Sequence, residues 1–364
     1  MNRTRLERAL DLAQAQGLDA LVLMPGPNLV YTTGLEFLLS ERPVLAFLPV
    51  DMPPALVLPQ LEAGKGQAAG FEVFPYTDEE GYALAFHEAC AQLELAEVRL
   101  GVEALRMRVL EARILQRYIP EVDLIPADEL FTALRLVKDT AELDAMRRAV
   151  RVAEAAFQAW LSHLYVGMPE REAAARLVAA LLTGGAEALA FEPIVVGGEN
   201  AALPHAVPGN RPFARGDWVV VDWGAVVDGY ASDITRMLVF GEPSGKLSEI
   251  HEIVCQANAA GRKAVGPGVE AHAVDAASRQ VIELAGYGPA FLHRTGHGLG
   301  LETHESPFIV SGNALALRAG MTFTVEPGIY IPGLGGVRIE DDVVVTETGV
   351  ETLTSLPREP FIVG

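Results

Sequence analysis

The strongest constraint on the fold is a pattern that occurs twice in the last two thirds of the chain. The strings VGMPEREAAARLVAAL at 166–181 and VGPGVEAHAVDAASRQVIEL at 265–284 predict two similar helices. After each helix, a glycine precedes an acidic residue by six positions, and a hairpin-like segment that begins at this acid ends in a second acid. These residues are Gly216, Asp222 and Asp233 in the first copy and Gly320, Glu326 and Glu340 in the second. Two copies of helix plus hairpin predict a domain with pseudo-twofold symmetry and carboxylates at its centre.

The four acids of the repeat and one histidine stand in apolar or glycine-rich runs, where a solvated charge is out of place. These residues are Asp222, Asp233, His297, Glu326 and Glu340. A buried carboxylate without a partner is costly, so the acids need cations or a shared metal. Four carboxylates and one imidazole suit two divalent ions such as Mn, Co or Zn. The pattern predicts a hydrolase with a metal-bound hydroxide.

The first hairpin can be derived from its turn. Asp228-Gly229 is a strong type I′ signal, and a turn there places Asp222 opposite Thr235. Asp222 and Asp233 are then diagonal neighbours on one face, about 7 Å or less apart, and able to chelate ions. The alternative is a polar face exposed to water, which the flanking VVVD and MLVF runs disfavour.

In the second hairpin, Arg338 and Glu340 are two positions apart and share a face. The arginine either neutralises carboxylate charge or contacts the substrate, and a structural ion pair is an equally open interpretation. Pro327-Gly328, directly after Glu326, predicts that strand pairing ends there. The histidines near the acids predict one ligand, His297, and further proton-transfer or oxyanion-stabilising groups: His205, His293 and His304.

Composition limits the function classes. A length of 364 residues predicts about two domains, and a net charge of −20 excludes a nucleic-acid-binding footprint. Only two cysteines occur, far apart, which favours a reducing compartment. No apolar run approaches the ~18 residues that a membrane span needs. We therefore expect a cytoplasmic protein without a membrane segment.

The first ~130 residues predict an α/β layer, with strands at DALVLM, PVLAFLPV, PALVLP and FEVFPY and helices at 82–97 and 106–118. A boundary falls near RLVKDTAEL, where Asp139 and Glu142 form a predicted capping box for a long helix. We expect an amino-terminal domain at 1–132 and a catalytic domain at 133–364.

Three strings resemble the Xaa-Pro peptidase branch of the pita-bread metallopeptidases, which includes prolidase and aminopeptidase P. They are PHAVPGNRPFARGDWVVVDWGAVVDGYASDITRMLVF, HRTGHGLGLETHESP and VEPGIYIPGLGGVRIEDDVVVTETG. RLVKDTAEL resembles the interdomain junction of that family, and NLVYTTGL its smaller domain. The resemblance implies an α/β (α+β) fold class, with a creatinase-like α/β domain followed by a pseudo-twofold pita-bread catalytic domain.

The resemblance also implies roles for the site residues. Asp222 and Asp233 would bind one metal and His297 the other, with Asp233 and Glu340 bridging both. Glu326 would ligate the histidine-bound metal and act as proton shuttle for a metal-bridging hydroxide. Substrate contacts and catalytic support would come from four residues: His205, His293, His304 and Arg338. The family implies two divalent ions per chain, Mn or Co before Zn, and a homodimer.

The expected substrates are small peptides with proline at the second position. We favour an Xaa-Pro dipeptidase, with an aminopeptidase P acting on longer peptides as the close alternative. The difference depends on space beyond the proline ring or on a cation that binds its carboxylate, for which Arg294 and Arg338 are candidates. Methionine aminopeptidase, creatinase-like chemistry without metals and a non-catalytic binding module are remote alternatives.

Overall fold

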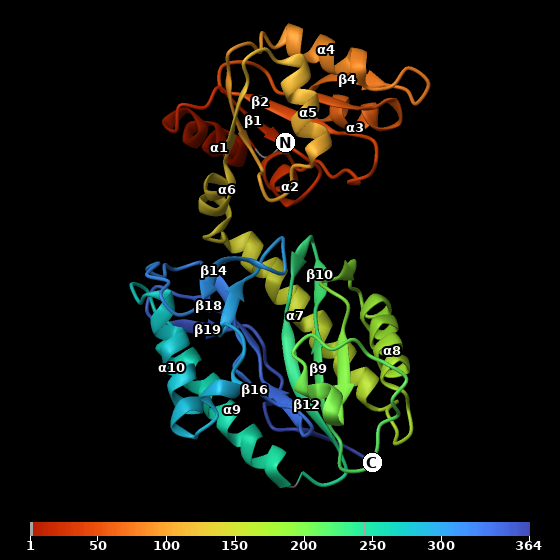
Figure 1. The fold of residues 1–364 in the computed structure, drawn as a ribbon, viewed down its shortest axis with the longest axis vertical. Coiled ribbons are helices and arrows are strands. Elements are labelled where there is room, and N and C mark those ends of the chain that lie inside the picture. The colour runs from red at the N-terminus through yellow and green to blue at the C-terminus, as the bar shows by residue number, and fades with distance from the viewer. Residues whose placement is uncertain (1–2, 244) are drawn as a thin grey trace. The chain divides into compact units, whose positions relative to one another are not determined.

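The computed structural model describes residues 3–243 and 245–364 (Figure 1). The chain separates into two compact units, residues 1–135 and 136–364, and each has its own buried apolar core. Among the described residues, no helix is long and apolar enough to cross a membrane.

The first unit is a six-stranded mixed sheet in the order β4-β3-β2-β1-β5-β6. Its strands are β1 Ala20–Leu23, β2 Leu45–Pro49, β3 Ala55–Pro59, β4 Glu72–Tyr76, β5 Arg99–Val102 and β6 Asp123–Pro126. Its helices are α1 Arg3–Ala15, α2 Pro27–Thr33, η1 Gln60–Glu62, α3 Ala63–Ala68, α4 Ala83–Gln92, α5 Val109–Tyr118 and α6 Asp128–Arg135. The four predicted strands are confirmed. Helix α4 ends before the predicted residue 97, because Glu94 adopts a φ of 50°, outside the helical region.

The second unit contains two similar halves (Figure 1). The first half contains α7 Thr140–Leu161, α8 Glu170–Thr183, β7 Ala188–Leu189, β8 Ile194–Gly197, η2 Gly198–Ala202, β9 Trp218–Trp223, β10 Ala225–Val227, β11 Tyr230–Ala231 and β12 Ile234–Phe240. The second contains α9 Gly245–Ala264, α10 Ala271–Leu284, η3 Gly288–Ala290, β13 Gly296–Gly298, β14 Glu305–Ile309, β15 Thr322–Val325, β16 Gly328–Ile331, β17 Gly335–Arg338, β18 Asp341–Val345 and β19 Val350–Thr352. The last strand, β20 Phe361–Val363, joins the sheet β20-β12-β9-β8, and the other large sheet is β14-β13-β15-β18-β19.

The predicted repeat is confirmed in the backbone of the two halves. Gly216 and Gly320 have φ values of 86° and 87°, which glycine adopts without strain. Each glycine donates its N–H to the end of the strand that returns after the hairpin, to the carbonyls of Phe240 and Val345. The strands that follow the glycines, β9 and β15, pair antiparallel with β12 and β18. The helix pairs α7–α8 and α9–α10 flank the central strands on opposite sides (Figure 1).

Helix α7 begins at the predicted capping box. Asp139 accepts the N–H of Glu142 at 2.9 Å, and the Glu142 carboxylate accepts the N–H of Asp139 at 2.8 Å. The apolar stripe of α7 packs onto the first sheet, where Phe157 stacks on Trp223 with ring centroids 4.3 Å apart. The helix thereby supports β9 from behind, on the strand that carries Asp222.

Candidate metal centre

The first hairpin has the predicted register. Asp228 and Gly229 have φ values of 51° and 76°, as a type I′ turn requires. Thr235 pairs with Asp222, and Asp233 lies just before β12. Since cross-strand and diagonal neighbours share a face, the hairpin directs both aspartates to the same side.

In the second half, His297 lies in the short strand β13, whose backbone closely approaches the two neighbouring strands, β14 and β15. A Cβ on Gly296 would lie 1.8 Å from the carbonyl oxygen of Thr324, and one on Gly298 would lie 2.1 Å from that of Ser306. Only glycine allows this approach, so the two glycines fix the depth at which His297 enters the site. Strand β15 stops at Val325, as Pro327 predicted, and leaves Glu326 at its end.

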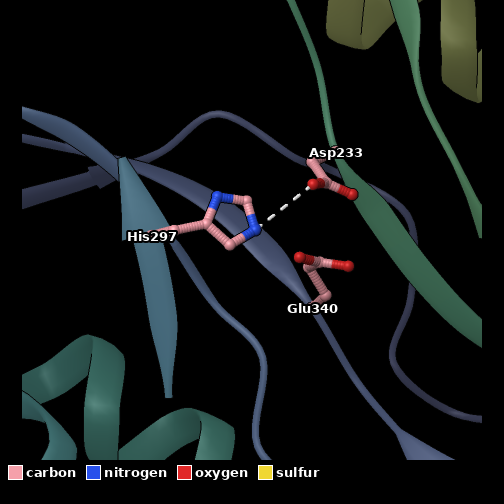
Figure 2. A group of neighbouring side chains, drawn as sticks. All are labelled: Asp233, His297 and Glu340. Carbon is pink, nitrogen blue, oxygen red and sulfur yellow. Dashed lines mark ion pairs between the residues drawn. The ribbon is translucent and has the colours of Figure 1, made fainter. Parts of the chain in front are cut away.

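The five predicted ligands and the four predicted accessory residues all line one cavity of about 620 Å³. They are Asp222, Asp233, His297, Glu326, Glu340, His205, His293, His304 and Arg338. Figure 2 shows Asp233, His297 and Glu340 turned toward one another. His297 belongs to strand β13 of the second half, whereas Asp233 and Glu340 directly precede strands β12 and β18 of the first and second halves. One ligand atom from each of these three lies within 4.8 Å of the others. The Nε2 atom of His297 is 3.3 Å from Glu326 Oε1 and 3.6 Å from Asp233 Oδ2.

The donor set fits divalent cations. Ligand atoms about 2.1 Å from a shared ion stand roughly 3.0–3.5 Å apart, close to the spacings around His297. The Oδ1 atom of Asp222 is buried and accepts no hydrogen bond from the described residues. Burial, and then the neighbouring carboxylates, raise the pKa of Asp233 and of Glu340 well above their usual values. Burial also raises the pKa of Glu326 to about 7. Carboxylates this crowded need positive charge to ionise together.

The tautomer of His297 suits a metal ligand. Its Nδ1 lies 3.2 Å from the carbonyl oxygen of Gly298, which can only accept, so Nδ1 carries the proton. Burial lowers the pKa of His297 to about 3, so the ring is neutral. The lone pair of Nε2 therefore points toward Asp233 and Glu326, as in metal-binding histidines whose other nitrogen is held by a carbonyl.

Arg338 neutralises one carboxylate and joins several site residues. It donates from Nη2 to Asp222 at 2.5 Å, from Nη1 to the Tyr330 hydroxyl at 2.8 Å and from Nε to the Thr235 hydroxyl at 3.1 Å. Thr235 in turn donates to Glu340 at 2.6 Å. Burial alone would lower the pKa of Arg338, but Tyr330 and the carboxylates raise it well above its usual value. The arginine is therefore a fixed cation of the site.

Three polar residues of this network were missed in the sequence: Tyr330, Thr235 and Thr324. Thr235 could have been found, because the hairpin register places it opposite Asp222. Thr324 accepts the N–H of His297 at 3.1 Å and donates to Glu326 at 3.2 Å. It lies two positions before Glu326, in the apolar run of β15, where a threonine gives no separate signal.

The accessory histidines differ in their surroundings. His293 donates from Nδ1 to the carbonyl of Arg294 at 2.8 Å, and burial lowers its pKa to about 4, so its Nε2 accepts from the Tyr330 hydroxyl at 2.9 Å. His304 is exposed, and its ring lies 4.1 Å from that of His297. His205 is also exposed at the cavity. His205 and His304 thus keep ring nitrogens accessible to a ligand.

A buried set of carboxylates around one neutral histidine, open to a cavity with histidines at its edge, defines the site of a metal-dependent hydrolase. The chain belongs to metallopeptidase family M24, whose model matches residues 144–347, and the Creatinase/Prolidase N-terminal domain model matches residues 5–137. The chain is thus a metallopeptidase, and the predicted resemblance and fold class are confirmed.

Three relatives illustrate the similarity. The chain is 43% identical over 232 residues to the Xaa-Pro dipeptidase of Pyrococcus furiosus, covering 64% of this chain and 67% of that protein. A dipeptidase structure from Pyrococcus horikoshii OT3 has a TM-score of 0.93 at 39% identity, covering 99% of this chain and 100% of that one. An X-Pro aminopeptidase structure from Thermotoga maritima has a TM-score of 0.87 at 33% identity, covering 98% and 99%. Dipeptidase and aminopeptidase structures therefore share this fold.

Proposed function

We propose that this metallopeptidase hydrolyses the bond before proline in small peptides, as an Xaa-Pro dipeptidase. The observation that carries the proposal is the convergence of five ligand-type side chains in one cavity whose other lining is largely apolar. That lining includes Phe191, Pro193, Ile194, Pro204, Val207 and Pro208. An apolar wall beside a polar centre suits a proline ring, which brings shape but no N–H.

The ligand set proposed for two divalent ions, Mn or Co, is Asp222, Asp233, His297, Glu326 and Glu340. When bound, such ions lower the pKa of water toward neutrality and polarise the scissile carbonyl. Glu326 is proposed to move the proton to the leaving proline nitrogen, because its carboxylate lines the cavity and lies 3.3 Å from His297 Nε2. Arg338 holds Asp222 in place.

The accessory residues are proposed to contact the substrate. His304 and His205, with accessible ring nitrogens, are suited to donate to the oxyanion or to hold the peptide. His293 donates to one carbonyl and accepts from Tyr330, so we propose that it acts by orienting Tyr330 and Arg338. Cytoplasmic location and a homodimer remain predictions, as does the boundary between residues 132 and 133.

The test is hydrolysis of Ala-Pro and Ala-Pro-Ala after reconstitution with Mn or Co, together with metal analysis. We expect about two ions per chain and faster turnover of Ala-Pro. Turnover of the tripeptide without the dipeptide would favour the alternative, an aminopeptidase P.

The matched variants for this test lie in one hairpin. Asp233→Asn should lower kcat/KM by more than about a hundredfold, beyond the usual effect of losing an outer partner of a metal ligand. Asp228→Asn should leave it unchanged, because Asp228 is at the exposed turn and asparagine tolerates its positive φ. Equal activity of both variants would refute the ligand assignment.

A further inference from the structure

A buried carboxylate outside the candidate metal centre, that of Glu170, lies in the first turn of helix α8. Glu170 is completely buried and does not line the cavity. Its Oε1 atom accepts the N–H of Gly197 and the side-chain amide of Asn200, each at 3.0 Å. Its Oε2 atom accepts from the same amide and from the N–H of Gly209, also at 3.0 Å. The carboxylate thus joins helix α8 to the end of strand β8 and to both ends of the loop that follows.

These hydrogen bonds close one loop of the cavity wall. We call residues 200–209 the His205 loop, and its two ends, Asn200 and Gly209, donate to the same carboxylate. Residues 204–208 of the loop all line the cavity. A loop whose ends are fixed to one buried group has fewer conformations open to it, so its middle is placed by its ends.

The middle of the His205 loop has little other support. Among the described residues, one side chain outside the loop donates a hydrogen bond to residues 203–208: Arg338, whose Nη1 lies 3.2 Å from the carbonyl oxygen of Pro204. His205 and Val207 are exposed at the cavity. The position of the His205 ring therefore depends on how the ends of the loop are held, and a shift of the ends would move the ring and the apolar wall together.

An ionised carboxylate suits Glu170 because the groups around it are donors. The backbone N–H groups of Gly197 and Gly209 and the side-chain NH₂ of Asn200 can only donate to it. A carboxylate accepts at both oxygens, whereas a glutamine amide has one oxygen and would direct its own N–H donors at one of these groups. Glu170→Gln, which keeps the shape of the side chain, should therefore break the hydrogen bonds at one of the two oxygens.

We propose that Glu170 is a positioning residue for substrate binding, which sets the place of His205 and of the apolar wall through the ends of the His205 loop. The inference rests on the proposed Xaa-Pro activity, in which His205 holds the peptide. Glu170 donates to and accepts from no candidate metal ligand, so its loss should weaken substrate binding and leave metal binding unchanged. A displacement of about 1 Å in such a group can cost up to about a hundredfold in rate.

The test compares kcat and KM for Ala-Pro in the Mn-reconstituted wild type, Glu170→Gln and the control Glu154→Gln. Glu154 is also a buried carboxylate of the second unit and accepts the N–H groups of Ser355 and Leu356, but it does not line or hold the cavity wall. In Glu170→Gln we expect KM to rise about 10-fold and kcat to change by less than about threefold. Both constants should stay within about twofold of wild type in the control, and the metal content should be unchanged in both variants.

A double-mutant cycle with His205→Ala separates positioning from a general loss of stability. Because Glu170 acts through the His205 loop, Glu170→Gln should lower kcat/KM at least about threefold less in the His205→Ala background than in the wild type. Equal losses in the two backgrounds would overturn the proposal, as would an unchanged KM in Glu170→Gln or an equal rise of KM in the control. If Glu170→Gln does not fold, Asn200→Ala, which frees one end of the loop, carries the same expectations.

Amide hydrogen exchange separates this inference from the proposed function, because it needs no turnover. If the wild type hydrolyses neither Ala-Pro nor Ala-Pro-Ala, the proposed activity fails. The amides of Gly197 and Gly209 should then still exchange at least about tenfold faster in Glu170→Gln than in wild type, and at the wild-type rate in Glu154→Gln. Exchange that is unchanged in Glu170→Gln, or equally faster in the control, would show that Glu170 does not hold the loop.

Discussion

Replacing Arg236 by methionine tests how much one buried ion network supports the metal centre. The Arg236 side chain is completely buried and pairs with the buried Asp341 at 2.8 Å. It also donates to four backbone carbonyls at 2.5–3.0 Å, those of Thr235, Glu340, Leu356 and Pro357. Two of these belong to residues beside or within the candidate ligand set. Methionine keeps part of the volume but donates no hydrogen bond.

The magnitude follows from the groups left behind. Asp341 retains Arg358 and Thr354, so its carboxylate stays compensated. Three carbonyls, those of Glu340, Leu356 and Pro357, lose their donor, at about 1–3 kcal/mol each. Removing one partner of a buried pair typically destabilises by about 3–5 kcal/mol, in agreement with the lower part of that sum. We expect a loss of about 3–5 kcal/mol.

Tryptophan fluorescence measures the unfolding of the second unit, which contains Arg236, because the three tryptophans, Trp160, Trp218 and Trp223, all lie in residues 136–364. With a urea m-value of about 3 kcal/mol per M, the midpoint should fall by about 1–1.7 M. The control is Arg148→Met, whose ion pair with Asp228 is exposed and contributes less than about 1 kcal/mol. Arg358→Met, which is partly exposed, should fall between the two. Equal midpoints for Arg236→Met and Arg148→Met would refute the reasoning.

Three further predictions concern the glycine approach, the metal and acid sensitivity. Gly296→Ala should abolish stabilisation by cations, because its Cβ would lie 1.8 Å from a backbone carbonyl oxygen. The control, Gly349→Ala, has open space around the added Cβ and should leave that stabilisation intact. Thermal melting with and without Mn measures both. Manganese at about 100 times its Kd should stabilise the chelator-treated protein by about 2.7 kcal/mol, and an equal gain in Asp233→Ala would contradict the site. Burial lowers the pKa of His251, so the folded protein binds a proton at this ring less readily than the unfolded chain does. The contribution of the neutral ring to the free energy of unfolding is therefore complete above the unfolded pKa of about 6.5, and the free energy of unfolding falls as the pH drops below that value, by at most about 1.4 kcal/mol per pH unit. In His251→Gln this fall should be less steep.

The sequence predicted the parts of the site whose signals are local. Asp228-Gly229 specified the turn, and the turn specified the register that places Asp222 opposite Thr235. Pro327 marked the end of β15, and the matched glycines Gly216 and Gly320 marked the repeat.

The parts that could not be predicted depend on tertiary approach. Nothing in the spacing of Tyr330 indicates that its hydroxyl joins His293 to Arg338. The position of the Arg294 guanidinium likewise depends on Phe308, fourteen positions later, because its Cζ lies 4.5 Å from the centroid of that ring. In the amino-terminal unit, strands β5 and β6 were not predicted, because each is only four residues long and neither is bounded by a strong turn signal.

The candidate ligands come from both halves of the second unit: Asp222 and Asp233 from the first, His297, Glu326 and Glu340 from the second. Neither half by itself offers a complete cage. A partly folded chain, in which the two halves have not yet packed together, would therefore lack the proposed metal centre, and we expect it to have no peptidase activity. Cations would then bind late in folding, and a bound ion would stabilise the contact between the two halves.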